Sequence, residues 1–497
     1  MRIAIVGAGF AGLASAKVLR QLGHDVTVHD KAPDVGGVWS RTRRYPGLRT
    51  QNNKQTYHFS DHPMPRRFPQ WLEGAQVQEY LEEYVARFGL APFLRLGTGV
   101  EQAVPAAGGG WDVTTTGAEA GTEHYDHLVV ANGIFCEPAI PDFEGVAELT
   151  AAGGRLIATS ELAGLEEVRD RHVLMVGYGK SSCDVAVEVS RVAASTTVVA
   201  RSLLWKVPRR IKGVLNYKYL LLTRLGEGLF PYQRLTGVER ALHARGSALP
   251  DAMLGSVEKV VTAQLGLPGL GLVPDAPFAS IAKASVSLAT EGFYEGVAAG
   301  TIAVRRDTVV ARFLEKDGLP HAELSDGSVV RADVVVCGTG FRQEVPFLPE
   351  DVQHRLLDER GNFALYRQIL PVDVPDLTFA GYNSSFFSPL SAEMSAVWIA
   401  SYLAGHHTVP APETMRAVVR DRVAWMEDRT DGHSARGTNV VPFSMHNIDE
   451  VLGEVGLDVG RATKAVQWLL PVRPSSYRKV AQRLARRVAR QASADSA

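Results

Sequence analysis

Two glycine-rich turns, far apart in the chain, are the feature that most restricts how this sequence can fold. Residues 2–12 read RIAIVGAGFAG, and residues 172–182 read HVLMVGYGKSS. Each turn follows a short apolar run and opens a segment with apolar residues at helical spacing, in the order strand, turn, helix. One such turn is weak evidence, but two of them predict that the chain binds two dinucleotides. A protein that holds two dinucleotides usually passes electrons from one to the other.

The first turn has a complete dinucleotide-binding fingerprint. Its candidate phosphate-binding residues are Gly7, Gly9, Phe10, Ala11 and Gly12. The first glycine makes the tight turn, the second lets the backbone approach a pyrophosphate, and the third lets the helix pack closely on the strand. The helix N-terminus adds free N–H groups and a favourable dipole. Asp30 ends the next strand at about the 20-residue spacing expected for a ribose-binding carboxylate. The alternative is a turn that is merely rich in glycine.

The second turn differs in two ways that bear on its ligand. Gly177 and Gly179 are present, but Ser182 stands where the third glycine would be, and serine is small enough to allow close packing. No acid ends the second strand. Cations and a hydroxyl follow it instead, at Arg201, Ser202 and Arg209. A cation at this place favours the 2′-phosphate of NADP over NAD. The alternative is a solvated basic loop.

Composition excludes several classes of protein. The chain has 497 residues, 45% of them hydrophobic and 22% charged, which is typical of a globular protein with at least two domains. The net charge of −1 gives no electrostatic reason to expect a nucleic-acid partner. Three scattered cysteines predict no disulfide framework, and no motif predicts a metal site. Since no signal peptide and no apolar run of about 18 residues is evident, we expect a cytoplasmic protein.

The order of segments predicts an α/β fold with two dinucleotide-binding, Rossmann-like domains, the second inserted into the first. We expect the first domain at residues 1–155 and 331–470 and the second at 156–330. Helical patterns at about 211–290 predict a helical insert within the second domain. Residues 471–497 form a basic C-terminal tail, with Val480, Leu484 and Val488 on one face of a helix. This tail is the one segment from which we would expect membrane contact, although a solvated or packed terminal helix is favoured.

Five motifs in this order resemble those of the class B flavoprotein monooxygenases, which include the flavin-containing and the Baeyer–Villiger monooxygenases. The motifs are GAGFAG (7–12), GGVW (36–39), GYGKSSCD (177–184), RSLLWKVPRR (201–210) and VVVCGTGF (334–341). Residues 48–65 resemble that family's segment beside the isoalloxazine ring, and residues 380–405 resemble its C-terminal flavin-capping helix. The resemblance covers about residues 1–210 and 300–405.

The resemblance implies that the first domain holds FAD and the second holds NADPH. The residues it assigns to FAD, beyond the first turn and Asp30, are Gly37, Val38, Trp39, Gly340 and Leu390. Those it assigns to NADPH are Gly177, Gly179, Ser181, Ser182, Asp184, Arg201, Ser202 and Arg209. In the family, NADPH reduces FAD, the reduced flavin takes up O₂ as a 4a-(hydro)peroxide, and one oxygen atom passes to the substrate.

Two positions depart from the family pattern. The family's linker motif contains a His after Phe143 and Gly145, but Ala158 and Thr159 occupy that region here. Many heteroatom-oxidising relatives have Asn in a T-N-x-x-K string beside the flavin, where this chain has Gln51, followed by Asn52. Either carboxamide could hydrogen-bond the flavin or the peroxide, so both are candidate catalytic residues.

We therefore expect an FAD- and NADPH-dependent monooxygenase that acts on a small lipophilic organic substrate and O₂. The expected chemistry is N- or S-oxidation or Baeyer–Villiger oxidation. The alternatives are an NADPH-driven flavin oxidase or reductase, a single-component flavin halogenase, and a non-catalytic nucleotide-binding scaffold. The sequence leaves the substrate and the oligomeric state open.

Overall fold

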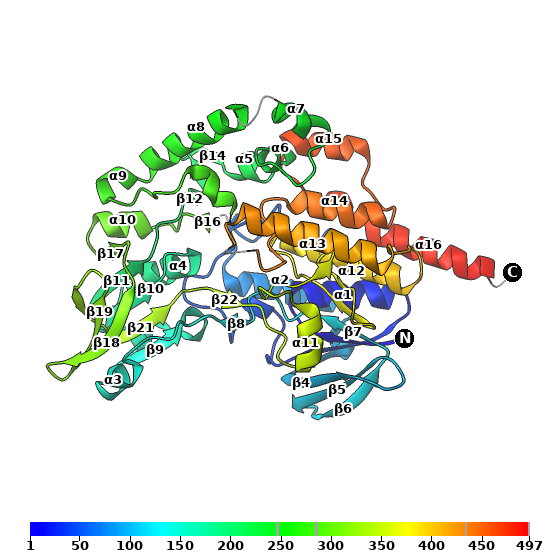
Figure 1. The fold of residues 1–497 in the computed structure, drawn as a ribbon, viewed down its shortest axis with the longest axis horizontal. Helices are drawn as coiled ribbons and strands as arrows, with labels where there is room; N and C mark the ends of the chain where they lie inside the picture. Colours follow the sequence, from blue (N-terminus) through cyan, green and yellow to red (C-terminus); the bar gives the residue numbers. More distant parts are fainter. Residues whose placement is uncertain (245–247, 284–286, 433–434, 496–497) are drawn as a thin grey trace.

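Two parallel β-sheets of five strands each form the centre of the structure (Figure 1). The computed structural model describes residues 1–244, 248–283, 287–432 and 435–495. The first sheet has the order β25 (Leu377–Phe379), β7 (His127–Val130), β1 (Arg2–Val6), β2 (Asp25–Asp30) and β3 (Leu94–Leu96). The second has the order β17 (Ala303–Arg306), β11 (Ser195–Ala200), β10 (His172–Val176), β21 (Val334–Cys337) and β9 (Arg155–Ala158). The fold is a mixed α/β fold, as the sequence predicted.

The two sheets are built from the same order of elements. In each, a central strand leads through a glycine-rich turn into a helix, β1 into α1 (Phe10–Gln21) and β10 into α4 (Lys180–Val189). In each, a three-stranded antiparallel sheet precedes the strand that returns beside the central one. These sheets are β4 (Thr98–Pro105), β5 (Trp111–Gly117) and β6 (Gly121–Tyr125), and β18 (Val310–Lys316), β19 (Leu319–Leu324) and β20 (Val329–Arg331). Strands β4 and β5 pair antiparallel, and β19 and β20 are joined by a turn at Asp326-Gly327.

The chain leaves the first sheet after β7, forms the second sheet, and returns to the first at β25. The outgoing and returning connections run side by side, because β8 (Glu137–Pro138) pairs antiparallel with β22 (Phe341–Arg342). The boundary expected at residue 331 is too early for the sheet itself. Strand β21 pairs with both β10 and β9, so the return follows Cys337.

Each glycine-rich turn is fixed by a close approach between two backbone segments. A Cβ atom at Gly7 would lie 2.5 Å from the Ala131 carbonyl oxygen, and one at Gly177 would lie 2.7 Å from the Gly338 carbonyl oxygen. Both glycines also have positive φ, +110° and +108°. A side chain is therefore excluded by space and by backbone conformation at both positions.

Short helices and strands connect these sheets to the remaining elements. Those beside the first sheet are the 3₁₀ segment η1 (Gly37–Trp39), α2 (Gly74–Phe88), η2 (Ala91–Phe93), α11 (Glu350–Leu356), β23 (Leu365–Tyr366) and β24 (Leu370–Pro371). Those beside the second are α3 (Val146–Ala151), η3 (Thr159–Glu161), η4 (Leu165–Val168) and α10 (Phe293–Ala298).

The segment predicted as a helical insert contains short strands as well as helices. Its elements, with the strand that leads into it, are β12 (Lys206–Val207), β13 (Arg210–Ile211), β14 (Leu215–Asn216), α5 (Lys218–Leu221), α6 (Arg224–Gly228), α7 (Gly237–Leu242), α8 (Ala248–Gln264), α9 (Leu267–Leu270), η5 (Phe278–Ala282) and β16 (Ser287–Leu288). Within the insert, α7 and α8 lie at the top of Figure 1.

The C-terminal part of the chain is helical and packs across the first sheet and the insert. Its helices are α12 (Ser388–Leu403), α13 (Pro412–Arg429), α14 (Ser444–Glu454), α15 (Arg461–Leu469) and α16 (Val480–Asp495). Helices α1 and α12 pack side by side. Helix α12 is buried over nearly its whole length, which its apolar sequence with no polar face requires.

Buried charges join the insert to α14. Glu227 of α6 accepts hydrogen bonds from the backbone N–H groups of Met445 and His446, each at 2.9 Å. The His446 ring lies between the carboxylates of Glu227 and Glu239. Burial opposes a charge on this ring, but the two carboxylates outweigh it and raise the pKa of His446 to about 10. The charged ring therefore links α6 and α7 to the start of α14.

The predicted basic tail is a packed helix. Val480 and Leu484 of α16 are buried, so the apolar face of this helix is already covered by the rest of the chain. Arg487 donates to the carbonyl oxygens of Val455 at 2.7 Å and Gly456 at 3.1 Å, just after α14 ends. Arg483 donates to the carbonyl oxygens of the next two residues.

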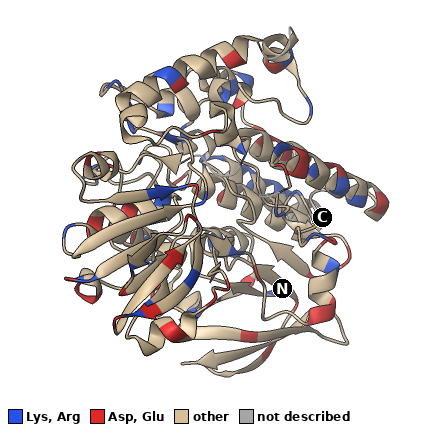
Figure 2. Cartoon of the chain, turned by 60° about the vertical axis from the view of Figure 1, so that its left-hand side comes forward, with Lys and Arg blue, Asp and Glu red and all other residues tan. Residues whose placement is uncertain are grey.

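Basic and acidic residues are interspersed over helices and strands alike (Figure 2). This distribution agrees with the small net charge of the sequence. In the ranges that the structure describes, we find no helix with the length and apolar character needed to cross a bilayer.

We predict opposite effects of alanine at two helical glycines. At Gly12, a Cβ atom would lie 1.8 Å from the Gly7 carbonyl oxygen, so Gly12→Ala should destabilise the protein by about 1–3 kcal/mol. At Gly255 in α8 the same atom meets nothing within 4 Å, so Gly255→Ala should stabilise it by about 0.5–1 kcal/mol. Urea unfolding of both variants measures this difference. Equal midpoints would contradict the close approach at Gly12.

Candidate functional site

Backbone atoms line the first glycine-rich turn. The segment at Gly36 and Gly37 runs beside it, since the Gly36 N–H donates to the Ala8 carbonyl oxygen at 3.1 Å. A Cβ atom at Gly9 would lie 3.6 Å from the Gly37 Cα, so two glycines face each other across the turn. Helix α1 begins here without a side-chain cap or an acid in its first turn. Its first N–H groups, Phe10 and Ala11 among them, are therefore available to an anion.

Asp30 lies at the end of β2, where the sequence placed it. Its carboxylate accepts hydrogen bonds from the N–H groups of Ala8 at 2.7 Å and Ala32 at 2.8 Å. Burial raises the pKa of this carboxyl, and the two N–H groups partly offset that shift. The carboxylate thus ties the glycine-rich turn to the end of the neighbouring strand.

The second turn is lined in the same way, with one substitution. The Ser182 hydroxyl donates to the Gly338 carbonyl oxygen at 3.3 Å, so the serine fits where the first unit needs a glycine. Helix α4 begins at Lys180 with Gly179 as an N-cap that offers no side-chain acceptor. Ser181 is partly exposed in its first turn. These N–H groups are also available to an anion.

Asp184 does not face solvent at the second turn. It is buried, pairs with Lys180, and accepts a hydrogen bond from the Thr290 hydroxyl at 2.7 Å. Its expected place at a pyrophosphate stays a prediction.

The expected 2′-phosphate residues differ in their environments. Arg201 and Ser202 are exposed just beyond the end of β11. Arg209 is buried, with its guanidinium 5.1 Å from the Trp71 ring centroid and 2.7 Å from the Glu291 carboxylate. The structure therefore places Arg209 against the loop of residues 50–71, where neither its sequence position nor its charge would have predicted it.

The carboxamides of Gln51 and Asn52 have different partners, and these partners fix their orientation. The Leu288 N–H donates to Gln51 Oε1 at 3.1 Å. This bond fixes the Gln51 oxygen as an acceptor and leaves the NH₂ group as a donor to other partners. Asn52 Nδ2 donates to the Phe386 carbonyl oxygen at 2.5 Å, so Asn52 keeps its Oδ1 as an acceptor. A backbone N–H requires an acceptor and a carbonyl requires a donor, so neither amide can be flipped.

The loop that carries these residues packs on both α1 and α12. The Phe10 ring lies 5.3 Å from that of Tyr57 and 5.1 Å from that of Phe59. Tyr57 also contacts Trp39, in the segment after Gly37 and Val38. The bond from Asn52 to Phe386 brings the loop to the start of α12, which contains the buried Leu390 in its first turn.

The starts of α1 and α12 also lie close to each other. A Cβ atom at Gly381, before α12, would lie 2.8 Å from that of Ala11. The first turn, the Asn52 loop and the start of α12 are therefore brought together. Gly340 lies in the returning connection, at a φ of +96°, with its carbonyl oxygen accepting from the Ala139 N–H at 3.0 Å.

A buried ionic group beneath this region was missed by sequence reasoning. Lys17 Nζ lies 2.5 Å from Asp61 Oδ2 and 3.9 Å from Glu393 Oε1. Glu393 also accepts from the Ser60 N–H at 2.7 Å and hydroxyl at 2.8 Å. The available signal was a charged residue within each of two apolar helical runs, Lys17 in α1 and Glu393 in α12.

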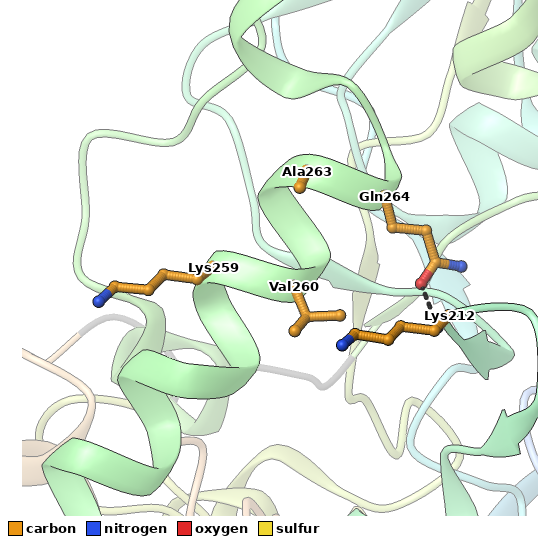
Figure 3. A pocket seen from close by; sticks show the side chains of 5 residues that line it. All are labelled: Lys212, Lys259, Val260, Ala263 and Gln264. Atoms are coloured by element: carbon orange, nitrogen blue, oxygen red, sulfur yellow. Dashed lines mark hydrogen bonds between the residues drawn. The ribbon is translucent and has the colours of Figure 1, made fainter.

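A surface hollow on the insert is separate from this site. Figure 3 shows its lining residues, which are Lys212, Lys259, Val260, Ala263 and Gln264. The Lys212 N–H donates to Gln264 Oε1 at 2.7 Å, which ties the β13–β14 turn to the end of α8. None of the predicted site residues lines it. Across the described ranges, no group of three side chains suited to hold a metal is found.

Comparison with known proteins identifies relatives over nearly the whole chain. Residues 1–238 match the family model described as "Flavin-binding monooxygenase-like". The probable flavin-containing monooxygenase 1 of Arabidopsis thaliana is 25% identical over 93% of this chain and 92% of its own length. The N-oxide-forming dimethylaniline monooxygenase 2 of Oryctolagus cuniculus is 25% identical over 94% of this chain and 84% of its own length.

Solved structures share the fold. The S-allyl-L-cysteine S-oxygenase of Allium sativum has a TM-score of 0.64 and 18% identity, and the match covers 99% of this chain and 98% of that one. The cyclohexanone monooxygenase of Rhodococcus sp. Phi1, bound to NADP⁺, has a TM-score of 0.69 and 19% identity, with 92% and 97% covered. These two matches show the shared fold, and the family model and the relatives above bear out the resemblance that the five motifs predicted.

We predict that Glu393 makes the stability of the protein depend on pH. Burial raises the pKa of its carboxyl to about 7, against the attraction of Lys17. The unfolded chain loses this proton near pH 4, so the contribution of Glu393 to stability falls as pH rises and levels off above pH 7. Between pH 5.5 and 8 the loss should be about 2 kcal/mol.

Glu393→Gln should remove this part of the pH dependence, because the amide does not ionise. Glu350→Gln, at an exposed carboxyl on α11, is the matched control and should keep the wild-type slope. Unfolding midpoints in urea at the two pH values measure both. Parallel curves for Glu393→Gln and the wild-type protein would show that the carboxyl does not titrate there.

Proposed function

We propose that this chain is a flavoprotein monooxygenase related to the class B enzymes, and that it uses FAD and NADPH to insert one oxygen atom of O₂ into a small lipophilic organic substrate. The reaction would consume NADPH, a proton, O₂ and the substrate, and yield NADP⁺, water and the oxygenated product. The observation that carries this proposal is the pair of glycine-lined turns, each at the start of an uncapped helix. Two such turns suit two dinucleotides in one chain.

We assign FAD to the first turn. Gly7, Gly9 and Gly12 would face its pyrophosphate, and the N–H groups at the start of α1 would bind the phosphate oxygens. Asp30 ends β2 where a ribose hydroxyl would lie. Gly37 supports this assignment, because a side chain there would narrow the space opposite Gly9. When bound, the flavin would supply the redox chemistry and the reaction with O₂.

We assign NADPH to the second turn. Gly177, Gly179 and Ser182 would leave room for its pyrophosphate, and Ser181 lies beside that space. Arg201 and Ser202 follow β11 and are exposed, which suits a 2′-phosphate. Arg209 would have to release Glu291 to join them, so we assign the 2′-phosphate first to Arg201.

The two carboxamides would act at the reacting centre with opposite polarity. Gln51 would donate a hydrogen bond and Asn52 would accept one, as their backbone partners require. Both groups are neutral, so they can orient reactants and hold a proton in place without removing it. This neutrality favours N- or S-oxidation. Baeyer–Villiger oxidation is the second candidate, because cyclohexanone monooxygenase shares the fold.

We predict that the purified protein binds flavin and is bleached by NADPH without oxygen. With O₂ and a suitable amine or sulfide, the NADPH consumed should match the oxygenated product, with little hydrogen peroxide released. Absorbance at the flavin band, together with peroxide and product assays, measures this. If every NADPH consumed yields hydrogen peroxide with every substrate tested, the result would favour an oxidase or reductase. Bound flavin that NADPH does not bleach would favour a non-catalytic scaffold, and a product that requires halide would favour a halogenase.

We also predict that the two arginines differ in coenzyme selectivity. Arg201→Ala should raise the KM for NADPH by about tenfold or more, with that for NADH nearly unchanged, because one charge-assisted contact is lost. Arg209→Ala should change both KM values by the same factor, since Arg209 contacts Trp71 and Glu291. Steady-state kinetics with both coenzymes test this. If Arg209→Ala raised the KM for NADPH but not that for NADH, Arg209 would have to be assigned to the 2′-phosphate after all.

A further inference from the structure

Gln51 is held from the side of the second sheet. The Tyr217 hydroxyl donates to the Gln51 backbone carbonyl oxygen at 2.8 Å, and the Leu288 N–H donates to its side-chain Oε1 at 3.1 Å. Tyr217 and Leu288 are at opposite ends of the insert in sequence. Both the backbone and the side chain of Gln51 are thus fixed by residues that belong to the other half of the chain.

Two further contacts to the same loop, beyond Gln51 in the chain, reinforce this arrangement. Lys218 Nζ lies 2.6 Å from Gln55 Oε1, and Arg210 Nη2 lies 3.0 Å from Gln70 Oε1. Together with the bonds from Tyr217 and Leu288 to Gln51, these contacts form what we call the junction. The junction joins residues 209–218 and Leu288 to the loop of residues 50–71. Within the junction, Tyr217 and Leu288 are the residues that bond to Gln51.

Tyr217 is suited to a fixed role. Its side chain is buried, and burial raises the pKa of its hydroxyl, so this group is a neutral donor at every working pH. Its own N–H donates to the Arg209 carbonyl oxygen at 3.2 Å, which anchors it at the base of the insert. The hydroxyl therefore has a defined position relative to the insert.

The junction continues to the second glycine-rich turn. Lys206 is fully buried, and its Nζ donates to the Tyr178 carbonyl oxygen at 2.6 Å, between Gly177 and Gly179. Lys206 lies in β12, which pairs in parallel with β16 through Val207 and Leu288. One unbroken series of contacts therefore runs from the second turn through Lys206 and Leu288 to Gln51.

We propose that Tyr217 is a positioning residue for Gln51, and that the series Tyr178, Lys206, Leu288, Gln51 links occupancy of the second turn to the orientation of this carboxamide. The inference rests on the proposed function for its consequence, since Gln51 would otherwise have no reaction to support. The contact from Tyr217 to Gln51 joins the two halves of a chain that lacks the linker histidine of the family pattern. The link is physical, because Lys206 bonds to Tyr178, its chain neighbour Val207 pairs with Leu288, and Leu288 bonds to Gln51.

The test uses Tyr217→Phe in the full-length holoenzyme, with Tyr219→Phe as the control. Tyr219 lies two residues along in α5, half exposed, and contacts Lys218. Hydrogen–deuterium exchange is measured in residues 50–56 with and without NADP⁺, together with NADP⁺ affinity and the share of NADPH lost as hydrogen peroxide.

In the wild-type protein and in Tyr219→Phe, NADP⁺ should slow exchange in residues 50–56. In Tyr217→Phe we expect this exchange to be about fivefold faster and the peroxide share to rise by a similar factor, as one lost hydrogen bond allows. Affinity for NADP⁺ and reduction by NADPH should stay within about twofold. Lys206→Met, which keeps the chain length but removes the donor, should abolish the effect of NADP⁺ on residues 50–56.

Identical exchange and peroxide release in the two tyrosine variants would overturn the inference. If the wild-type protein makes no oxygenated product, the proposed function fails, yet the exchange measurement still decides whether Tyr217 positions the loop. Should Tyr217→Phe fail to fold, Gln51→Ala decides the matter, because the Leu288 amide loses its acceptor and its exchange should quicken. Unchanged exchange at Leu288 in that variant would count against the proposal.

Discussion

The close approach of a carbonyl oxygen to a glycine in each sheet is the constraint on which the rest of the molecule depends. At Gly7 and Gly177 the central strand turns so near its neighbour that no side chain fits. The turn then directs the start of a helix toward the carboxyl edge of the sheet, with its N–H groups unpaired. Because both sheets use the same order of elements, the chain has two equivalent edges at which unpaired helix N–H groups are available to an anion.

The loop of residues 36–71 contacts elements that belong to both halves of the chain. It contacts α1 through Phe10, the start of α12 through Asn52, and the insert through Gln51. Few of its residues are in regular structure, so its shape comes from these contacts together with hydrogen bonds inside the loop, such as the one from the Lys54 N–H to the Gln70 carbonyl oxygen at 2.8 Å. Such a loop can place polar groups at positions that a helix or a strand could not reach.

Much of the fold could be predicted from sequence because its signals are local. Gly7 and Gly177, the strands around them and helix α12 follow from spacing and apolar runs. The position of Arg209 could not be predicted, because its partners Trp71 and Glu291 are distant in the sequence. The same holds for Lys17 with Glu393. The expected boundary at residue 331 failed for the sheet because a strand's pattern does not reveal which sheet it joins.

The last helix has a consequence for the insert, although the two are far apart in sequence. The guanidinium group of Arg487 in α16 neutralises the negative, C-terminal end of α14. At the opposite end of α14, the Met445 N–H donates to the Glu227 carboxylate. Electrostatic support therefore passes along one helix axis from the chain's end to its middle. A homologue shortened near residue 470 would need some other cation at that terminus of α14, or its α6 and α7 would be held less firmly.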